Sequence, residues 1–126
     1  MKAAVFHRAH EPLSIETVTV DKPQDREVLV RTVATGVCHS DLHYVDGDLP
    51  ARSHPMVMGH EGSGVVEAVG SAVTTVKPGD HVLDFYRQGR LNLDDMVSKR
   101  GKLEDVNEAF RAMKAGEVAR TVLTFD

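Results

Sequence analysis

The segment from Gly59 to Val82, which reads GHEGSGVVEAVGSAVTTVKPGDHV, carries strong signals for the fold. Its middle part, Gly62–Gly70, is an apolar run bounded by glycines, which is typical of a half-buried strand. Lys77–Asp80 (KPGD) is a strong turn signal, and His81–Phe85 is a further short run that predicts a strand. Short strands separated by turns at this close spacing predict a barrel or a sandwich.

Three more strands are expected before this stretch. Lys2–His7 is a short apolar run, and Glu27–Ala34 is rich in β-branched residues. Leu13–Val20 also carries alternating apolar residues, but the alternation slips by one residue after Ile15. We therefore expect a bulge or a break in that strand.

The last third of the chain changes character. Leu103–Ala115 predicts a helix, because its apolar residues recur at intervals of three and four and form one face. Gly116 is a natural C-terminal stop for that helix, and Arg120–Phe125 predicts a closing strand. The expected fold class is therefore mainly β with some α. The apolar face of the helix consists of Val106, Ala109, Phe110 and Met113.

The composition limits the classes of function. The 126 residues are the size of one domain, so a single domain over 1–126 is expected. The net charge of −4 argues against a nucleic-acid or anionic-membrane surface. No apolar run is long enough for a membrane span, and the first residues lack the apolar core of a signal peptide, so the expected location is the cytoplasm. The only cysteine, Cys38, excludes a disulfide within the chain.

Chemically active side chains gather between Gly36 and Glu61, a stretch with little periodicity that holds four of the seven histidines. Such irregular segments often carry function on a rigid scaffold. His7, His10, His54 and His81 are expected to be surface or structural residues. The candidate ligands and bases are Cys38, His39, Ser40, Asp41, His43, His60 and Glu61.

Three interpretations of this cluster stay open on the residues alone. Zinc takes thiolate, imidazole and carboxylate ligands. One Cys, one His and one carboxylate would leave its fourth coordination position open, as in catalytic zinc sites. Alternatively, Cys38 is a thiol nucleophile with His43 or His60 as its base, although Asp41 and Glu61 would oppose a lowered thiol pKa. The third interpretation is a buried cysteine among ordinary loop residues.

Gly62-Ser63-Gly64 is only superficially a dinucleotide-binding fingerprint. The position of the third glycine is occupied by Glu67, and a strand pattern follows where the fingerprint requires a helix. We therefore expect no nicotinamide dinucleotide site of the usual kind in this chain.

Two motifs together resemble a known family. GVCHSDLHYVDGDLP (Gly36–Pro50), followed by the stretch Gly59–Val82, resembles the zinc-dependent alcohol dehydrogenases of the medium-chain dehydrogenase/reductase family. Tyr86–Phe125 resembles the C-terminal return segment of that family. The resemblance implies a GroES-like catalytic domain, a distorted β-barrel with a C-terminal helix and closing strand. Residues 1–85 would form the barrel part and 86–126 the return segment.

The resemblance implies a zinc centre. Cys38 and His60 match two ligands of the catalytic zinc, and Glu61 matches the acidic neighbour behind the metal. Asp41 matches the carboxylate that orients the histidine ligand, and it could also substitute for a ligand.

The resemblance further implies groups for alcohol oxidation with NAD. Ser40 matches the hydroxyl that takes the proton of a small alcohol, and His43 the base that passes it to solvent. His39 and Arg120 match positions that contact the cofactor pyrophosphate.

The chain departs from the family pattern in three ways. The family's third zinc ligand is a second cysteine, which is absent here, as are the structural-zinc lobe and the Rossmann domain. We expect that the cofactor domain was lost, by engineering or natural deletion, and that the two ends were joined near Asp84–Tyr86.

Three consequences are expected from this loss. The chain would be inactive as a dehydrogenase on alcohols or aldehydes. It could instead be a zinc-binding module with at most weak hydrolytic activity. It could also be a self-associating, engineered folding-model domain that forms a homo-oligomer through the exposed former domain interface.

Overall fold

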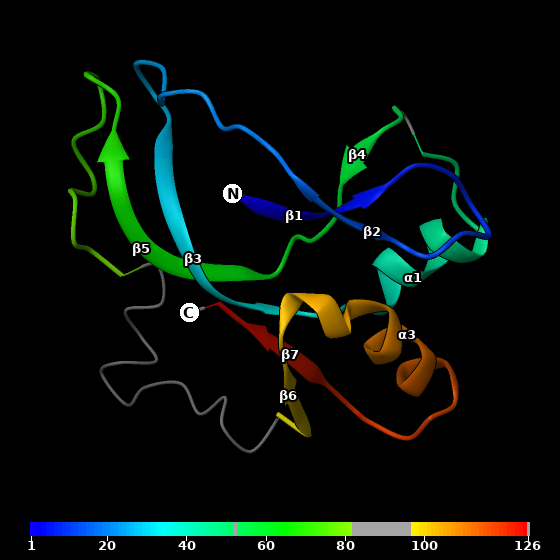
Figure 1. The fold of residues 1–126 in the computed structure, drawn as a ribbon. Helices are drawn as coiled ribbons and strands as arrows, with labels where there is room; N and C mark the ends of the chain where they lie inside the picture. The colour runs from blue at the N-terminus through cyan, green and yellow to red at the C-terminus, as the bar shows by residue number, and fades with distance from the viewer. Residues whose placement is uncertain (52, 82–96, 126) are drawn as a thin grey trace.

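The computed structural model describes residues 1–51, 53–81 and 97–125, which form two β-sheets and two α-helices (Figure 1). The class expected from the sequence, mainly β with some α, is confirmed. Within these ranges no strand pairing joins the two sheets, so the expected barrel is open. The strands are β1 (Lys2–Phe6), β2 (Ser14–Thr17), β3 (Val28–Gly36), β4 (Met56–Val57), β5 (Gly62–Val69), β6 (Lys99–Gly101) and β7 (Thr121–Thr124).

The first sheet has the order β2-β1-β4, and both pairings are antiparallel. The expected strand Leu13–Val20 is shorter than predicted, because β2 ends at Thr17, next to the slip in the alternation. This confirms the predicted break. The two residues of β4, Met56 and Val57, were not predicted, because so short a strand shows no periodicity.

The second sheet has the order β5-β3-β7-β6. β3 and β5 pair antiparallel over most of their length, and the pairing has two register shifts. β7 pairs antiparallel with β3, and the short β6 lies parallel to β7. Because β7 comes from the C-terminal end of the chain, this pairing places residues near 120 beside the end of β3.

The turn predicted at Lys77–Asp80 is confirmed by a backbone hydrogen bond from Asp80 to Lys77. His81 forms a single bridge with Val65 of β5. The rest of the predicted strand His81–Phe85, and the expected junction near Asp84–Tyr86, lie outside the described residues.

The predicted C-terminal helix is confirmed, with its first turn wound as a 3-10 helix (Leu103–Asp105) that continues into α3 (Val106–Lys114). Gly116 follows it with a φ of 70°, as expected of a stop. A second helix, α1 (His39–Asp46), was not predicted, because it is short and weakly amphipathic. Its signal is Gly47, whose φ of 82° ends the helix in the left-handed conformation that glycine tolerates best.

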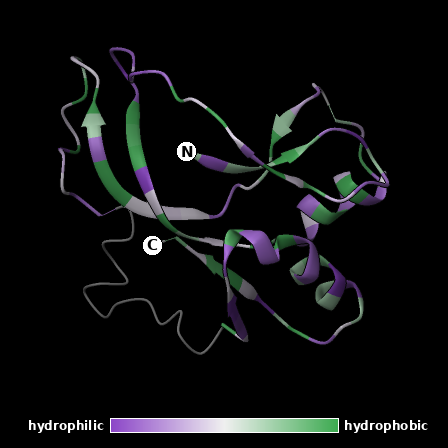
Figure 2. Ribbon diagram, in the orientation of Figure 1, coloured by the Kyte–Doolittle hydropathy of each residue, from purple (hydrophilic) through white to green (hydrophobic). Residues whose placement is uncertain are grey.

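The hydrophobic core lies where the two helices meet the sheets. Both helices carry hydrophobic residues among hydrophilic ones (Figure 2). Asn107 of α3 also ties the C-terminal part to the N-terminal part, because its side chain accepts from the N–H and donates to the C=O of Leu13, at 2.9 Å each. The buried core residues are Ala4, Phe6, Leu13, Val37, Leu42, Val106, Ala109, Phe110 and Leu123.

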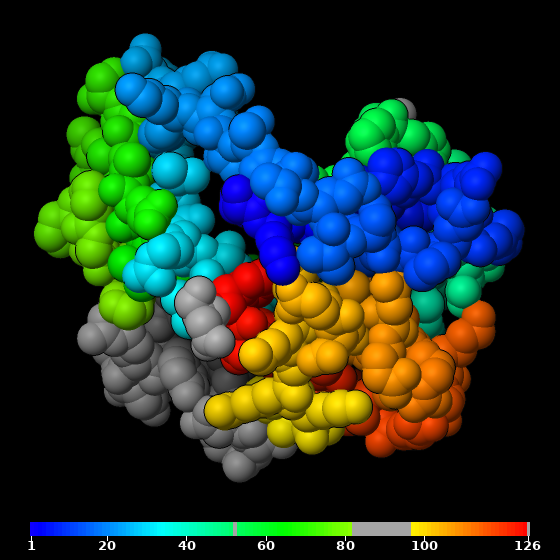
Figure 3. Space-filling view, in the orientation of Figure 1, coloured from blue at the N-terminus to red at the C-terminus, as the bar shows by residue number. Residues whose placement is uncertain are grey.

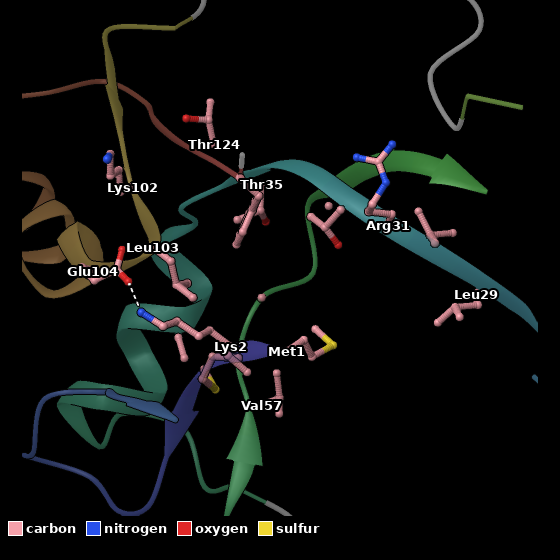
Figure 4. Close-up of a pocket in the computed structure, with 18 of the residues that line it drawn as sticks. Met1, Lys2, Leu29, Arg31, Thr35, Val57, Lys102, Leu103, Glu104 and Thr124 are labelled. Atoms are coloured by element: carbon pink, nitrogen blue, oxygen red, sulfur yellow. Dashed lines mark hydrogen bonds and ion pairs between the residues drawn. The ribbon is translucent and has the colours of Figure 1, made fainter. Parts of the chain in front are cut away.

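A hollow separates the N-terminal strand from β3 and β5 on the face shown in Figure 3. It has a volume of about 640 Å³ and a mostly apolar lining from both sheets, including Met1, Leu29 and Val57 (Figure 4). An ion pair between Lys2 and Glu104, 3.0 Å long, lies at its edge. Within the described ranges, no helix has the length and apolar character needed to cross a membrane.

Candidate metal centre

Two segments meet at the end of β3 to form the site. Cys38 directly precedes α1, and His60 and Glu61 directly precede β5. The antiparallel pairing of β3 with β5 brings Thr35 opposite Gly62, and the N–H of Gly36 donates to the C=O of Glu61 at 3.2 Å. Strand pairing therefore joins two loops that are far apart in the sequence.

Three candidate zinc ligands converge at this junction. Cys38, His60 and Glu61 each offer one ligand atom, and these atoms lie within 4.8 Å of one another. They form the one such group of three among the described residues. This donor set suits zinc, because it consists of one thiolate, one imidazole and one carboxylate. It is accessible from solvent and leaves a fourth coordination position for another ligand.

His60 is oriented by a buried carboxylate. Its Nδ1 lies 3.2 Å from Oδ1 of Asp41, whose side chain is only 7% exposed, whereas the His60 side chain is 51% exposed. A partner on Nδ1 fixes the ring and leaves Nε2 free for another contact, as in many histidine ligands of metals. The structure thus places the carboxylate of Asp41 against Nδ1 of His60.

Ser40 lies between the thiol and the imidazole. Its Oγ is 3.2 Å from Sγ of Cys38 and 3.2 Å from Nε2 of His60. Residue types and spacing did not predict the second contact, because the two residues are 20 positions apart and meet only through strand pairing.

His43 and His39 lie on the outer side of α1. Nδ1 of His43 is 3.0 Å from Oδ2 of Asp48, and the rings of His39 and His43 are 5.2 Å apart. Among the described contacts, no hydrogen bond joins Ser40 to His43. The structure therefore brings Ser40 into the centre and leaves His43 at its margin.

Arg120 enters the centre from the C-terminal segment. Its Nη1 donates to Oε2 of Glu61 at 2.6 Å, in a half-buried ion pair. Gly36 makes room for the carboxylate, because a Cβ at this position would lie 2.1 Å from Oε2 of Glu61. The sequence analysis did not predict this contact, because no local signal links two residues that are 59 positions apart.

The histidines outside the motif take other roles. His7 pairs with Glu16 across the first sheet and thereby lowers the pKa of that carboxyl. The ring of His54 lies 5.4 Å from that of Phe6. Neither joins the candidate ligands.

The apolar hollow is a separate feature. None of the candidate site residues lines it, although β3 and the start of β5 contribute to both. Reactive groups and the large apolar cavity therefore occupy different places in the described part of the chain.

Comparison with known proteins agrees with the motifs. Residues 24–123 match the family described as "Alcohol dehydrogenase GroES-like domain". The chain is 50% identical over 105 residues to an NDMA-dependent alcohol dehydrogenase of Amycolatopsis methanolica, with 75% of this chain and 28% of that protein covered. It is also 50% identical over 84 residues to an S-(hydroxymethyl)glutathione dehydrogenase of Saccharomyces cerevisiae, with 67% and 22% covered.

Solved structures show the same likeness. The benzyl alcohol dehydrogenase of Acinetobacter calcoaceticus superposes with a TM-score of 0.60 at 44% identity, with 64% of this chain and 22% of that chain covered. The chain spans about a quarter of the length of the curated relatives it matches. The family match covers residues 24–123 of the 126, so the chain belongs to the alcohol dehydrogenase GroES-like domain family.

Proposed function

We propose that these 126 residues are the metal-binding, alcohol-facing part of a zinc-dependent alcohol dehydrogenase that uses NAD. The convergence of Cys38, His60 and Glu61 carries this proposal. Zinc accepts each of these ligand types, and Asp41 holds the His60 ring so that Nε2 faces the other ligands. A bound zinc would supply a Lewis acid that polarises the oxygen of an alcohol or aldehyde.

The chain's own polar groups would serve the same substrate. The Ser40 hydroxyl lies beside two of the candidate ligands, Cys38 and His60, and would receive the proton of an alcohol bound there. His43, at the exposed margin of α1, would exchange that proton with solvent. His39 and Arg120 would meet the pyrophosphate of NAD, and Arg120 would then share its guanidinium between the cofactor and Glu61.

We propose further that these residues alone do not oxidise alcohols. Hydride transfer requires the nicotinamide to be held beside the alcohol carbon, and such positioning is worth up to roughly 7–11 kcal/mol. The one glycine pair that resembles a dinucleotide fingerprint opens β5 instead of a helix, so it offers no helix N-terminus to a pyrophosphate. Dinucleotide binding would have to come from another domain.

One sample tests both proposals. Zinc content after zinc-supplemented dialysis should approach one ion per chain, and NADH formation from benzyl alcohol should stay at the level of the buffer blank. A zinc-free protein would refute the metal centre. NADH formation that persists through a second purification step would refute the proposed inactivity.

A zinc-binding module with weak, metal-dependent hydrolysis is a second candidate function. The exposure of the candidate ligands favours it. The His60 side chain is 51% exposed, so a metal bound at this centre would have a coordination position accessible to water. Hydrolysis of an activated ester that disappears with a chelator and returns with zinc would support it.

Self-association is proposed on separate grounds. Met1 and Val57 are more than half exposed beside the apolar hollow, and Val33 is 41% exposed. Apolar surface of this kind favours association. Light scattering behind a sizing column should show a homodimer or a larger species, whereas a monomer mass at high concentration would contradict it.

A further inference from the structure

Ser40, His60 and Asp41 form one hydrogen-bonded row. Ser40 Oγ lies 3.2 Å from His60 Nε2, and His60 Nδ1 lies 3.2 Å from Asp41 Oδ1. We propose that this row acts as a serine–histidine–aspartate triad, with which the chain hydrolyses activated esters when no metal occupies His60. The inference goes beyond the proposed dehydrogenase function, which uses the same histidine as a metal ligand.

The direction of the hydrogen bonds follows from the chemistry of the three groups. With the Asp41 carboxylate as the acceptor at Nδ1, the His60 ring donates from Nδ1 and is left to accept at Nε2. The Ser40 hydroxyl donates to Cys38 Sγ at 3.2 Å and lies at the same distance from His60 Nε2, so its one proton can turn from the thiol to the imidazole. With the proton of His60 on Nδ1, the imidazole is the tautomer that a general base requires.

The elements hold the row in place while leaving it accessible. Ser40 and Asp41 lie in the first turn of α1, and His60 lies in the segment before β5. Asp41 is buried, so it anchors the ring, whereas half of the His60 side chain is exposed. A nucleophile and base within hydrogen-bond distance, with the base oriented by a third group, are the defining geometry of such a site.

The same helix offers donors for the charge that develops during acyl transfer. α1 begins at His39, and the N–H of Asp41 already donates to the C=O of Cys38 at 3.2 Å, so the N–H groups that precede this bond are those of His39 and Ser40. Ser40 carries its hydroxyl on this turn, beside its own N–H. Backbone N–H groups of this kind stabilise the oxyanion in acyl transfer.

The proposed reaction needs no oxidant or reductant. Ser40 Oγ attacks the ester carbonyl carbon while His60 Nε2 takes the hydroxyl proton, and the bond to the leaving alcohol breaks as that proton is returned to it. Water then attacks the acyl-serine with His60 as base, which releases the carboxylic acid and restores the serine. The substrate class is esters of acidic alcohols, such as p-nitrophenyl acetate.

Metal binding and this reaction exclude each other. A zinc ion on His60 Nε2 would occupy the lone pair that must accept the serine proton. Zinc is therefore expected to inhibit the triad, whereas it would activate a metal-dependent hydrolase. The sign of the zinc effect separates the two.

The test follows p-nitrophenyl acetate hydrolysis by the full chain in excess chelator. We expect the protein to hydrolyse the ester faster than buffer with the same chelator does. The rate of the protein should fall at least about tenfold in Ser40→Ala and in His60→Gln. Ser53→Ala, an exposed serine away from the centre, is the matched control and should keep the full rate. Stoichiometric zinc should inhibit, and phenylmethylsulfonyl fluoride should modify Ser40, as located by peptide mass spectrometry.

Each other outcome would overturn the proposal. These outcomes are the absence of chelator-resistant hydrolysis, an unchanged rate in folded Ser40→Ala, activation by zinc, and acylation of Cys38 in place of Ser40. Circular dichroism spectra identical to those of the parent chain establish that the variants are folded. Zinc binding measured on the same preparations tests the metal centre independently, so failure of the triad leaves the proposed function unaffected.

Discussion

Arg120 Nη1 donates a hydrogen bond to Glu61 Oε2 at 2.6 Å, and this contact joins the residue before β7 to the residue before β5. Charge-assisted bonds between arginine and carboxylate are among the stronger polar contacts in proteins. Glu61 is therefore held at the candidate metal centre by a cation from the far end of the chain. A metal ion at this centre would share the carboxylate with the guanidinium.

Replacing Glu61 by glutamine is expected to weaken zinc binding at least about tenfold, because the centre loses the charge of one of its three candidate ligands. Competition with a chromophoric chelator measures the affinity. Glu67→Gln is the matched control, since Glu67 pairs with Arg31 on β3 and belongs to no group of candidate ligands. Equal affinities in the two variants would show that Glu61 does not bind the metal.

Gly36→Ala is expected to weaken zinc binding without unfolding the chain. The new Cβ would lie 2.1 Å from Glu61 Oε2, so the carboxylate must move away from Arg120. The clash is with the end of a flexible side chain, so the backbone can stay in place. Gly62→Ala is the control, because a Cβ there meets no heavy atom within 4 Å. A zinc affinity that is the same in both variants would refute the role given to Gly36.

Asn107→Ala is expected to lower the free energy of unfolding by about 1–3 kcal/mol, because it leaves the half-buried N–H and C=O of Leu13 without their partner. Urea denaturation followed by circular dichroism measures this change. Gln24→Ala, in an exposed loop, should stay within about 0.5 kcal/mol of the parent chain. A loss no larger than that of the control would show that this bridge does not stabilise the junction of the two parts.

Arg111 predicts a pH dependence of stability. Its hydrogen bonds to Glu108 and Glu117 hold the pKa of both carboxyls below the ordinary value. A lowered folded-state pKa contributes stability that is present above the unfolded value of about 4.3 and is lost as the pH falls through the folded values. Both pairs are exposed, so the effect is small and screened by salt.

The measurement is the melting temperature between pH 7 and pH 3 at low salt. Arg111→Gln should lose less on acidification than the parent chain, because the variant has already lost the two pairs. Arg26→Gln, an exposed arginine elsewhere, should follow the parent curve. Parallel curves for the parent chain and Arg111→Gln would contradict the assignment.

The fold was predictable where side chains alone show a period. Gly62–Val69 and Val106–Lys114 were predicted within a few residues, because each buries an apolar face that repeats along its own segment. The short β4 and β6 were missed. β6 reads Lys-Arg-Gly, and it is a strand only because its backbone pairs with β7 at the edge of the sheet. The pattern of side chains along the sequence does not predict backbone pairing of this kind.

The residues of the candidate site were predictable from the sequence, but the contacts between them were not. The motif named Cys38, His60, Glu61 and Asp41 through a resemblance, and the structure brings all four together. α1, which carries Ser40 and Asp41, was missed, because only two of its eight residues are buried and it has little apolar periodicity. The contacts of Ser40 with His60 and of Arg120 with Glu61 have no local signal at all.

The chemical types at the centre, the alternation of the long strands and the apolar face of α3 follow from the sequence, because these are properties of neighbouring residues. That the loop after β3, the loop before β5 and the residue before β7 share one site is seen only in the folded chain. This arrangement depends on β3 pairing with both β5 and β7. Such pairing is set by hydrogen bonds and burial between distant segments, which no local pattern in the chain records.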